Sequence, residues 1–331
     1  MRLICYLYYG LFAFAVFISY GSSAQERSSW KPDKHVEMIV PFSPGTALDH
    51  AARAMQGIWT TNRVMSVSST VINKGGGGGA LGWLYLEQHP KDAHYVAIGS
   101  PTLLTNQIIG TGRASYTDFT PLAMILNEYT VFAVRADSNV KSGTDLIQRL
   151  RSDPQSLSFS VGSALGNINH IALASLATTV GIDSKRLKAV AFASAGAGMT
   201  ALLGGHVDVA VSSMGLFVPQ VEAGKLRLIA VGAPRRLSGA LAQIPTWKEQ
   251  GVAAESDSWR VMLGPRGITN EQIRYWEGVF LQLSKDQEWQ SLAKARYLDA
   301  SFRDSRTTRT ALDAEYVQLK AVLEDLGMAK Q

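Results

Sequence analysis

The feature that most limits the fold is a regular alternation between short, nearly continuous apolar runs and longer amphipathic segments. Such runs are typical of strands covered on both faces, and strands separated by helices favour a parallel sheet. The first amphipathic segment spans 46–59 and the last spans about 310–326, where Gly327 ends it. The alternation therefore predicts an α/β protein with largely parallel sheets. The expected strands are 35–42, 64–73, 95–100, 129–134, 157–163, 188–193, 207–213, 226–232 and 259–264.

The length of the chain bears on how many units it forms. With 331 residues, it is long enough for about two domains. The segments 111–128 and 233–258 are candidates for crossovers between two lobes, the second because it is rich in loop residues. Two crossovers would make the first lobe discontinuous. We expect a first lobe from 25–124 plus 235–331 and a second lobe from 125–234.

The N-terminus has the three parts of a secretory signal peptide. Arg2 is the only charge before Glu26, residues 3–20 are almost wholly apolar or aromatic, and small residues follow up to Ala24. This order predicts a signal peptide at 1–24 that is cut after Ala24. A retained membrane anchor is the alternative, because the run is about long enough to span a bilayer. No later stretch is comparably apolar, so no other span is expected.

Cysteine and charge content exclude several functions for the exported chain. The single cysteine, Cys5, lies in the predicted signal peptide, so no disulfide, thiolate metal site or thiol nucleophile remains. The six histidines show no ligand spacing, and we predict no metal. The net charge of +5 is modest, and no aromatic–basic interleaving points to nucleic acid.

The loop after the first strand could bind an anion. Ser43 can serve as N-cap with Pro44 at the first helical position, or Thr46 and Asp49 can form a capping pair. Either arrangement leaves backbone N–H groups free at the positive end of a helix, which is a ready anion site. Ordinary capping without a ligand is the alternative reading.

A run of five glycines, 75–79, follows the second expected strand. Together with Gly82 it satisfies G-x-G-x-x-G, but consecutive glycines satisfy many patterns. The acidic residue that should hold a ribose about 20 positions later is missing. A tight turn with close backbone approach is the favoured interpretation, and no cofactor is predicted.

The second lobe offers comparable loops. Asn167 is a good N-cap, and Ser163 and Gly166 leave polar backbone exposed at the end of a strand. His170 falls in the first helical turn and is expected to be a packed or capping residue.

Two further positions belong to this lobe. Residues 194–198 form another small-residue loop before a helix, and Asp208 is a carboxylate with apolar neighbours that is either paired structurally or faces a cleft. Because ligands bind at the carboxyl ends of strands, loops of this kind in two facing lobes predict an anion in a cleft.

In their order, these motifs resemble the solute-binding receptors of tripartite tricarboxylate transporters, known as Bug receptors. The resemblance covers about residue 35 to the C-terminus. It rests on IVPFSPGTALDHAAR, VINKGGGGGALG, FSVGSALGNINH, ALLGGHVDVAVSS, AGKLRLIAVGAPRR, IPTWKEQGV and WRVMLGPRGIT.

The resemblance implies a non-enzymatic periplasmic receptor of two lobes that close like a Venus flytrap on a small carboxylate. It also implies delivery to integral membrane permease subunits, and a monomer is expected. A sensor for a membrane kinase and a nucleotide-dependent enzyme are the alternatives. Thr46 stands where the family usually has glycine. The implied ligand-binding residues are Phe42, Ser43, Gly45, Thr46, Asp49, Ser163, Gly166, Asn167, Ser194, Ala195 and Asp208.

Overall fold

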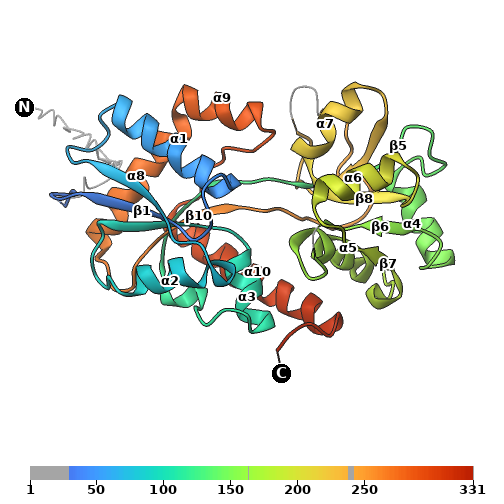
Figure 1. Cartoon of the computed structure of the whole chain (residues 1–331), viewed down its shortest axis with the longest axis horizontal. Coiled ribbons are helices and arrows are strands. Elements are labelled where there is room, and N and C mark those ends of the chain that lie inside the picture. The colour runs from blue at the N-terminus through green and yellow to red at the C-terminus, as the bar shows by residue number, and fades with distance from the viewer. Residues whose placement is uncertain (1–29, 163, 238–241, 331) are drawn as a thin grey trace, which may run out of the picture.

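The computed structural model describes residues 30–162, 164–237 and 242–330, which form two lobes joined by extended segments (Figure 1). Each lobe is built on its own five-stranded sheet with helices on both faces. The expected two-lobed α/β architecture is therefore confirmed. The predicted signal peptide at 1–24 and Ser163 lie outside the described residues.

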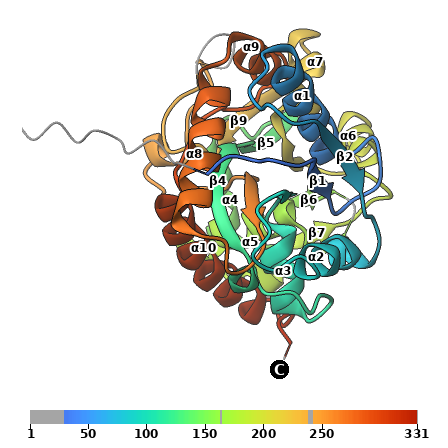
Figure 2. The same ribbon diagram turned by 90° about the vertical axis from the view of Figure 1, so that its left-hand side faces the viewer.

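The first lobe is defined by the sheet with strand order β2-β1-β3-β10-β4. One core on this sheet contains side chains of α1, α8 and α9, including the buried Trp59, Trp276 and Trp289. Helices α2, α3 and α10 cover the opposite face (Figure 2), where their side chains form a second core. The elements are β1 (Val36–Val40), α1 (Ala47–Thr61), β2 (Ser69–Asn73), η1 (Gly77–Gly79), α2 (Ala80–Glu87), β3 (Tyr95–Gly99), α3 (Thr102–Ile109), η2 (Tyr116–Asp118), β4 (Thr120–Leu126), β10 (Arg260–Gly264), α8 (Asn270–Lys285), α9 (Gln287–Ala295) and α10 (Ser305–Asp325).

The second lobe is defined by the sheet with order β7-β6-β8-β5-β9. The core on one face of this sheet contains side chains of α4 and α5, and the core on the other face contains side chains of α6 and α7. The elements are β5 (Thr130–Arg135), α4 (Gly143–Ser152), β6 (Ser158–Ser160), α5 (Ile168–Thr179), η3 (Ser184–Arg186), β7 (Lys188–Val190), α6 (Ala195–Leu203), β8 (Val209–Ser213), α7 (Met214–Glu222) and β9 (Leu226–Val231), followed by η5 (Lys248–Gln250).

Strand direction follows from the way the chain passes between the lobes. Four strands of each sheet run the same way, and the exceptions are β10 in the first lobe and β5 in the second. Each exception is the first strand after a crossover. Because a crossover enters a sheet at the edge that faces the other lobe, that strand must run away from this edge. The prediction of largely parallel sheets holds, with this exception.

All nine expected strands are present, but the structure adds one that was missed. The segment 111–128, predicted as a crossover, contains β4, and the chain changes lobe only at 127–129. The run PLAMIL in β4 is fully buried and apolar, a signal that the crossover interpretation overlooked. The last helix begins at Ser305 instead of 310. The lobe boundaries of the sequence prediction stay a prediction.

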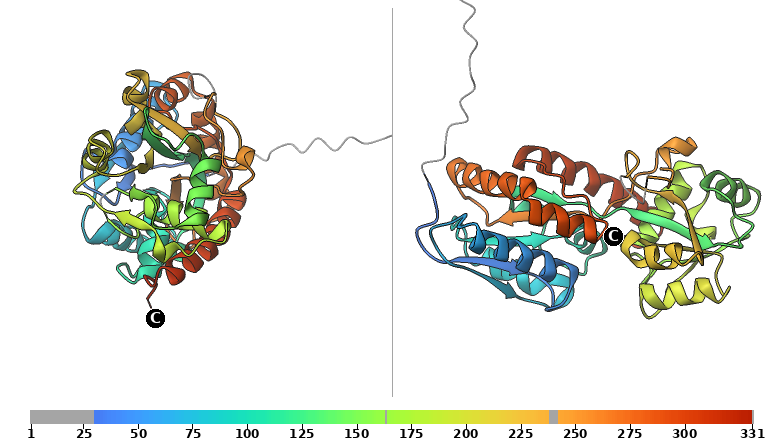
Figure 3. Two further views of the ribbon diagram at one scale, coloured as in Figure 1. Left: turned by 90° about the vertical axis from the view of Figure 1, so that its right-hand side faces the viewer. Right: turned by 90° about the horizontal axis from the view of Figure 1, so that it is seen from above.

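Helix α10 belongs to the first-lobe core yet also touches the second lobe. Leu319 and Leu323 of α10 share a buried cluster with Ile171 of α5. Asp325, at the end of α10, accepts a 2.6 Å hydrogen bond from the Ser184 hydroxyl. Figure 3 shows the two lobes from above and along the long axis. Within the described residues, no helix is long and apolar enough to cross a membrane.

Candidate functional site

The candidate site lies where the two sheets turn their edges toward each other. The first lobe presents the carboxyl ends of β1, β2 and β3, and the second presents those of β6, β7 and β8. The segments 127–129 and 232–259 leave the sheets at these same edges, so the two edges must face each other. This is the place where α/β proteins bind ligands.

The first-lobe loop is held by a cap at Thr46. The Thr46 hydroxyl accepts a hydrogen bond from the Asp49 amide (3.4 Å), so the N-cap of α1 is Thr46 and the alternative cap at Ser43 is wrong. Gly45 has a φ of +82°, which favours glycine there. Phe42 is half-buried against the first-lobe core, and Ser43 is exposed.

Asp49 organises this loop from beneath. Its side chain is only 4% exposed. It accepts hydrogen bonds from the Gly45 amide (2.8 Å), the Arg53 Nε (3.1 Å) and the Asn73 Nδ2 (2.9 Å). Burial alone would raise the pKa of Asp49, but these hydrogen bonds outweigh it and lower the pKa to about 2. Asp49 is therefore ionised and fully engaged, and it shapes the loop from a buried position.

The glycine run packs tightly behind this loop. A Cβ on Gly75 would lie 2.9 Å from the Ser43 amide nitrogen, and a Cβ on Gly82 would lie 2.5 Å from the Cβ of Pro41. Four glycines of the run, 76–79, have positive φ. The run thus allows the close backbone approach expected from the sequence. Among the described residues, no group of three or more His, Cys, Asp or Glu side chains could hold a metal.

Two side chains hold the second-lobe loop that follows β6: that of Asn167, the N-cap of α5, and that of His170, in the first turn of α5. Asn167 caps α5 by accepting from the amides of Asn169 and His170, both at 3.0 Å, and its Nδ2 donates to the Val161 carbonyl at 2.9 Å. His170 is buried, as expected, and its Nδ1 lies 2.9 Å from the Gly166 amide. Gly166 has a φ of +82°.

A second helix of this lobe begins beside the loop. Ser194 caps α6 by accepting a 3.1 Å hydrogen bond from the Ala197 amide, and Ala195 is its first helical residue. This loop follows β7, so it opens toward the same edge as Asn167. Ser194 is exposed, and its hydroxyl proton remains free to donate outward.

Asp208 lies elsewhere. It precedes β8 and accepts from the amide (2.8 Å) and the hydroxyl (2.7 Å) of Ser158, the first residue of β6. These are the amino-terminal ends of both strands, opposite the edge that carries Asn167 and Ser194. Of the two roles that the sequence left open for Asp208, the structure assigns the paired one and removes it from the site.

Two loops at the facing edges were not predicted from the sequence. Ser100 and Thr102 follow β3, with their hydroxyls 2.8 Å apart, and Thr102 begins α3. Ser213 ends β8 and is the N-cap of α7, where its side chain makes no capping hydrogen bond. Both loops begin at the carboxyl ends of strands that the sequence predicted, so extending the strand-end rule to every strand would have found them.

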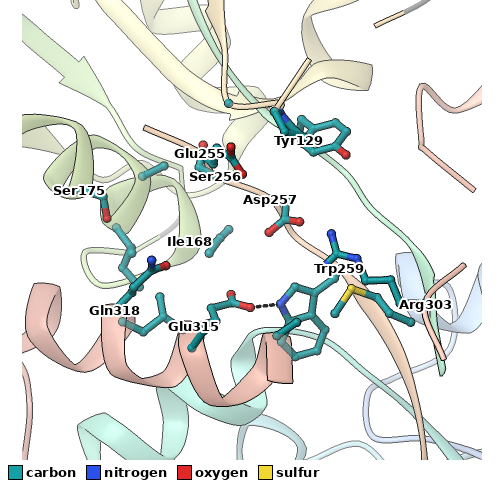
Figure 4. Close-up of a pocket in the computed structure, with 18 residues that line it drawn as sticks. Tyr129, Ile168, Ser175, Glu255, Ser256, Asp257, Trp259, Arg303, Glu315 and Gln318 are labelled. Atoms are coloured by element: carbon teal, nitrogen blue, oxygen red, sulfur yellow. Dashed lines mark hydrogen bonds between the residues drawn. The ribbon is translucent and has the colours of Figure 1, made fainter. Parts of the chain in front are cut away.

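A cavity of about 320 Å³ lies beside the site, between α5, α10 and the crossover segments (Figure 4). Asp257 and Glu315 line it, and the Trp259 indole donates a hydrogen bond to Glu315. Burial, and next the neighbouring Asp257, raise the pKa of Glu315 to about 8. Arg303 lines the cavity as well, and none of the loop residues above belongs to it. This cavity is therefore separate from the anion-ready loops.

The chain matches the family model described as tripartite tricarboxylate transporter family receptor over residues 59–328. A protein from the tcbD-tcbE intergenic region of Pseudomonas sp. (strain P51) is 27% identical over 268 residues, covering 78% of this chain and 76% of that protein. Protein BugT of Bordetella pertussis is 24% identical over 254 residues, covering 75% of each chain.

Solved structures show the same architecture. A TctC solute-binding protein from Polaromonas, solved without ligand, has a TM-score of 0.81 at 21% identity and covers 89% of this chain and 99% of its own. The R. palustris protein Rpa4515, solved with adipate, has a TM-score of 0.70 at 25% identity, over 90% of this chain and 99% of its own.

Proposed function

The chain belongs to the tripartite tricarboxylate transporter family of receptors, and from this membership we propose that it binds a small organic dicarboxylate between its two lobes. Adipate, bound by the R. palustris relative, is a dicarboxylate. We further propose that each lobe holds one carboxylate of the ligand, and that the ligand passes from the receptor to membrane permease subunits.

The observation that carries the proposal is the convergence of helix N-termini from both lobes. Helices α1, α5 and α6 all begin at the facing edges, each with a polar side chain at its cap. The first amides of a helix have no partner within it. Among the described residues, no acceptor is recorded for the amides of Ala47, Leu48, Ala195 and Gly196. Such amides at positive dipole ends favour a carboxylate.

Recognition by amides and hydroxyls also agrees with the state of Arg53, the basic side chain beside the first-lobe loop. Arg53 is held by Asp49 and by Asn73, whose Oδ1 accepts from Arg53 Nη2 at 3.0 Å. Its charge is thus compensated before any ligand arrives. A site made of backbone dipoles and water can hold an anion and still release it, as a transport receptor must. The proposed ligand contacts are Phe42, Ser43, Gly45, Thr46, Gly166, Asn167, Ser194 and Ala195, with Ser163 carried over from the family pattern.

The test is titration calorimetry of the purified exported protein against acetate, malate, adipate, citrate and neutral amino acids. We expect at least one dicarboxylate to bind with a Kd near 1 μM, equivalent to about −8 kcal/mol. Acetate should bind far more weakly, because it offers one carboxylate to a site with two anion-ready halves. Absence of binding by every carboxylate in the panel would reject the proposal.

The Thr46 hydroxyl is expected to donate to the ligand while it caps α1. The variant Thr46→Ala should weaken dicarboxylate binding about tenfold or more, because it removes a hydrogen bond to a charged group. Loss of the cap should also cost about 1 kcal/mol of stability. Thr46→Ser, which keeps the hydroxyl, should bind like the natural protein. Calorimetry and urea unfolding measure the two effects.

The matched control is Ser142→Ala. Ser142 caps α4 in the same way, accepting a 3.1 Å hydrogen bond from Asp145, but α4 follows β5, which runs away from the facing edge. This variant should lose similar stability and keep its affinity. Equal affinities in Thr46→Ala and Ser142→Ala would show that Thr46 does not touch the ligand.

The cellular setting follows from the same proposal. We infer export through the signal peptide at 1–24, cleavage after Ala24, and action in the periplasm as a monomeric receptor without catalysis. We propose that the first lobe is discontinuous, close to the expected division of 25–124 plus 235–331 and 125–234, but with β4 kept whole in the first lobe and η5 in the second. Mass spectrometry of the exported protein should give a chain that starts at Gln25, whereas a chain that keeps residues 1–24 would identify an anchored form.

A further inference from the structure

The loop that the second lobe presents to the cleft is tied to a buried histidine. His170 is 7% exposed, in the first turn of α5, and its Nδ1 accepts a 2.9 Å hydrogen bond from the Gly166 amide. Nδ1 can accept only when it carries no proton. The imidazole that fits this geometry is therefore neutral, with its proton on Nε2.

The bond restrains a residue that has few other restraints. Gly166 has a φ of +82° and no side chain, and a Cβ built there would lie 3.2 Å from the Sδ of Met328. Within the described residues, the bond to His170 is the one hydrogen bond recorded for Gly166. Neighbouring Asn167 uses its side chain to cap α5 and to bind Val161. The imidazole thus sets where the Gly166 amide points.

Burial, and not a neighbouring charge, is the cause that shifts the pKa of His170. Burial lowers the pKa of His170 below the ordinary value of 6.5. The elements packed most extensively against α5 are α10, η3 and β8, and α4 shares its core. On α4, Asp145 is paired with Arg149. The crossover residues Glu255, Asp257 and Arg303 line the cavity next to α5. On α10, Asp325 is bonded to Ser184, Glu324 is paired with Lys320, and Glu315 faces the cavity beside Ile168 and Ile171. On η3 stand Lys185 and Arg186, the tail carries Lys330, and β8 has no ionisable side chain.

We propose that His170 is a positioning residue which holds the second-lobe ligand loop in its binding arrangement only while its ring is neutral, so that protonation releases the ligand. The inference rests on the proposed function, because it assumes that this loop contacts the ligand. Protonated His170 has two N–H donors and no acceptor, so it cannot keep the bond to Gly166. The loop then has to turn its amide away.

The direction in which ligand affinity changes with pH follows from the linkage between proton binding and ligand binding. Above the pKa of His170 the ring is neutral, and affinity is constant. Below that pKa each bound ligand must displace a proton, so the Kd rises toward tenfold for each further pH unit. Weakening on acidification is the expected sign, and a histidine paired with an anionic ligand would give the opposite one.

The first arm of the test follows binding with adipate as probe, by calorimetry between pH 7.5 and 5. The natural protein should weaken toward tenfold per unit at the acid end. His170→Asn places an amide oxygen near the position of Nδ1 and has no proton to gain, so its Kd should rise only as far as protonation of adipate itself requires, well short of the rise in the natural protein. His206→Asn, at an exposed histidine of the second lobe, should keep the natural profile. Equal profiles for the natural protein and His170→Asn overturn the proposal.

The second arm needs no ligand, so it separates this proposal from the proposed function. Nitrogen-15 NMR of the ligand-free protein should show His170 with its proton on Nε2 at neutral pH. The Gly166 amide should titrate with the same pKa as the His170 ring, and this titration should vanish in His170→Asn. A proton on Nδ1 at neutral pH, or a Gly166 amide indifferent to the ring, overturns the proposal whether or not adipate binds.

Discussion

Asp49→Ala should lose about 3 kcal/mol of unfolding free energy and all measurable ligand binding, the largest effect expected from a single side chain here. The substitution leaves the Gly45 amide, the Asn73 amide group and the Arg53 guanidinium without the buried acceptor that they share. Breaking a buried charged network costs several kcal/mol. The ligand loop loses the carboxylate that ties it to both α1 and the end of β2, so its amides no longer converge.

Helix α4 supplies a matched control. Asp145 occupies the same place after its cap, accepts from the Lys141 amide (2.9 Å) and pairs with Arg149 four residues on, but its side chain is 28% exposed. It has no counterpart to Asn73. Asp145→Ala should therefore cost only about 1 kcal/mol and leave ligand affinity unchanged. Equal costs for the two variants would show that burial and the Asn73 contact add nothing.

The cost at Asp49 should depend on pH in a defined direction. A carboxyl whose pKa falls from 3.8 to about 2 on folding stabilises the folded state fully above pH 3.8 and loses that contribution as the pH drops toward 2. Urea unfolding of the natural protein and Asp49→Ala should thus give curves that converge on acidification. A gap that stays constant down to pH 2 would contradict the assigned hydrogen bonds.

Glu315→Gln is expected to stabilise the protein in alkaline solution. Because the pKa of Glu315 rises from 4.5 to about 8 on folding, the stabilising contribution of its protonated form is complete below pH 4.5 and is lost as the pH rises through 8. Glutamine is neutral at every pH and can still accept from Trp259. At pH 9 the variant should exceed the natural protein by ~2–4 kcal/mol, and at pH 4 the two should be nearly equal.

Unfolding midpoints in urea between pH 4 and 9 measure this difference. Glu324→Gln is the control, since Glu324 lies on the same helix with its side chain 56% exposed. It should show no comparable gain with pH. Parallel pH curves for Glu315→Gln and the natural protein would mean that Glu315 ionises normally in the folded state.

Strand periodicity was enough to predict an α/β fold with largely parallel sheets, and the resemblance of the motifs to the receptor family added the two lobes. The first of these successes has a physical reason. Strands buried on both faces must be apolar along their length, so β1, β3 and β8 can be recognised from the sequence. The helical segments between successive strands can be recognised by their amphipathic pattern. The missed strand β4 has the same apolar run, but its loop-like flanks, TGRAS before and NEY after, suggested a crossover. Which lobe a strand joins depends on contacts across more than 100 residues, and such contacts leave no local pattern.

The candidate site was predictable in part for a related reason. Capping chemistry is local, so Asn167 and Ser194 could be identified as caps from their own neighbours. Thr46 and Ser43 were left as alternatives because either fits the same few residues. The network that joins Asp49 to Asn73 spans 24 residues, and the pairing of Asp208 with Ser158 spans 50. Neither partner could be read from sequence spacing.

The position of β10 also sets the order in which the two sheets can be completed as the chain emerges from its N-terminus. The second-lobe sheet uses only residues 130–231, so it can be completed while the rest of the chain is still being delivered. The first-lobe sheet cannot, because its fourth strand in spatial order, β10, is inserted between β3 and β4 and arrives more than 130 residues after β4. Until then β3 and β4 have bare edges, which are prone to pair with other chains. The first lobe is thus the half that needs protection from aggregation until β10 has arrived.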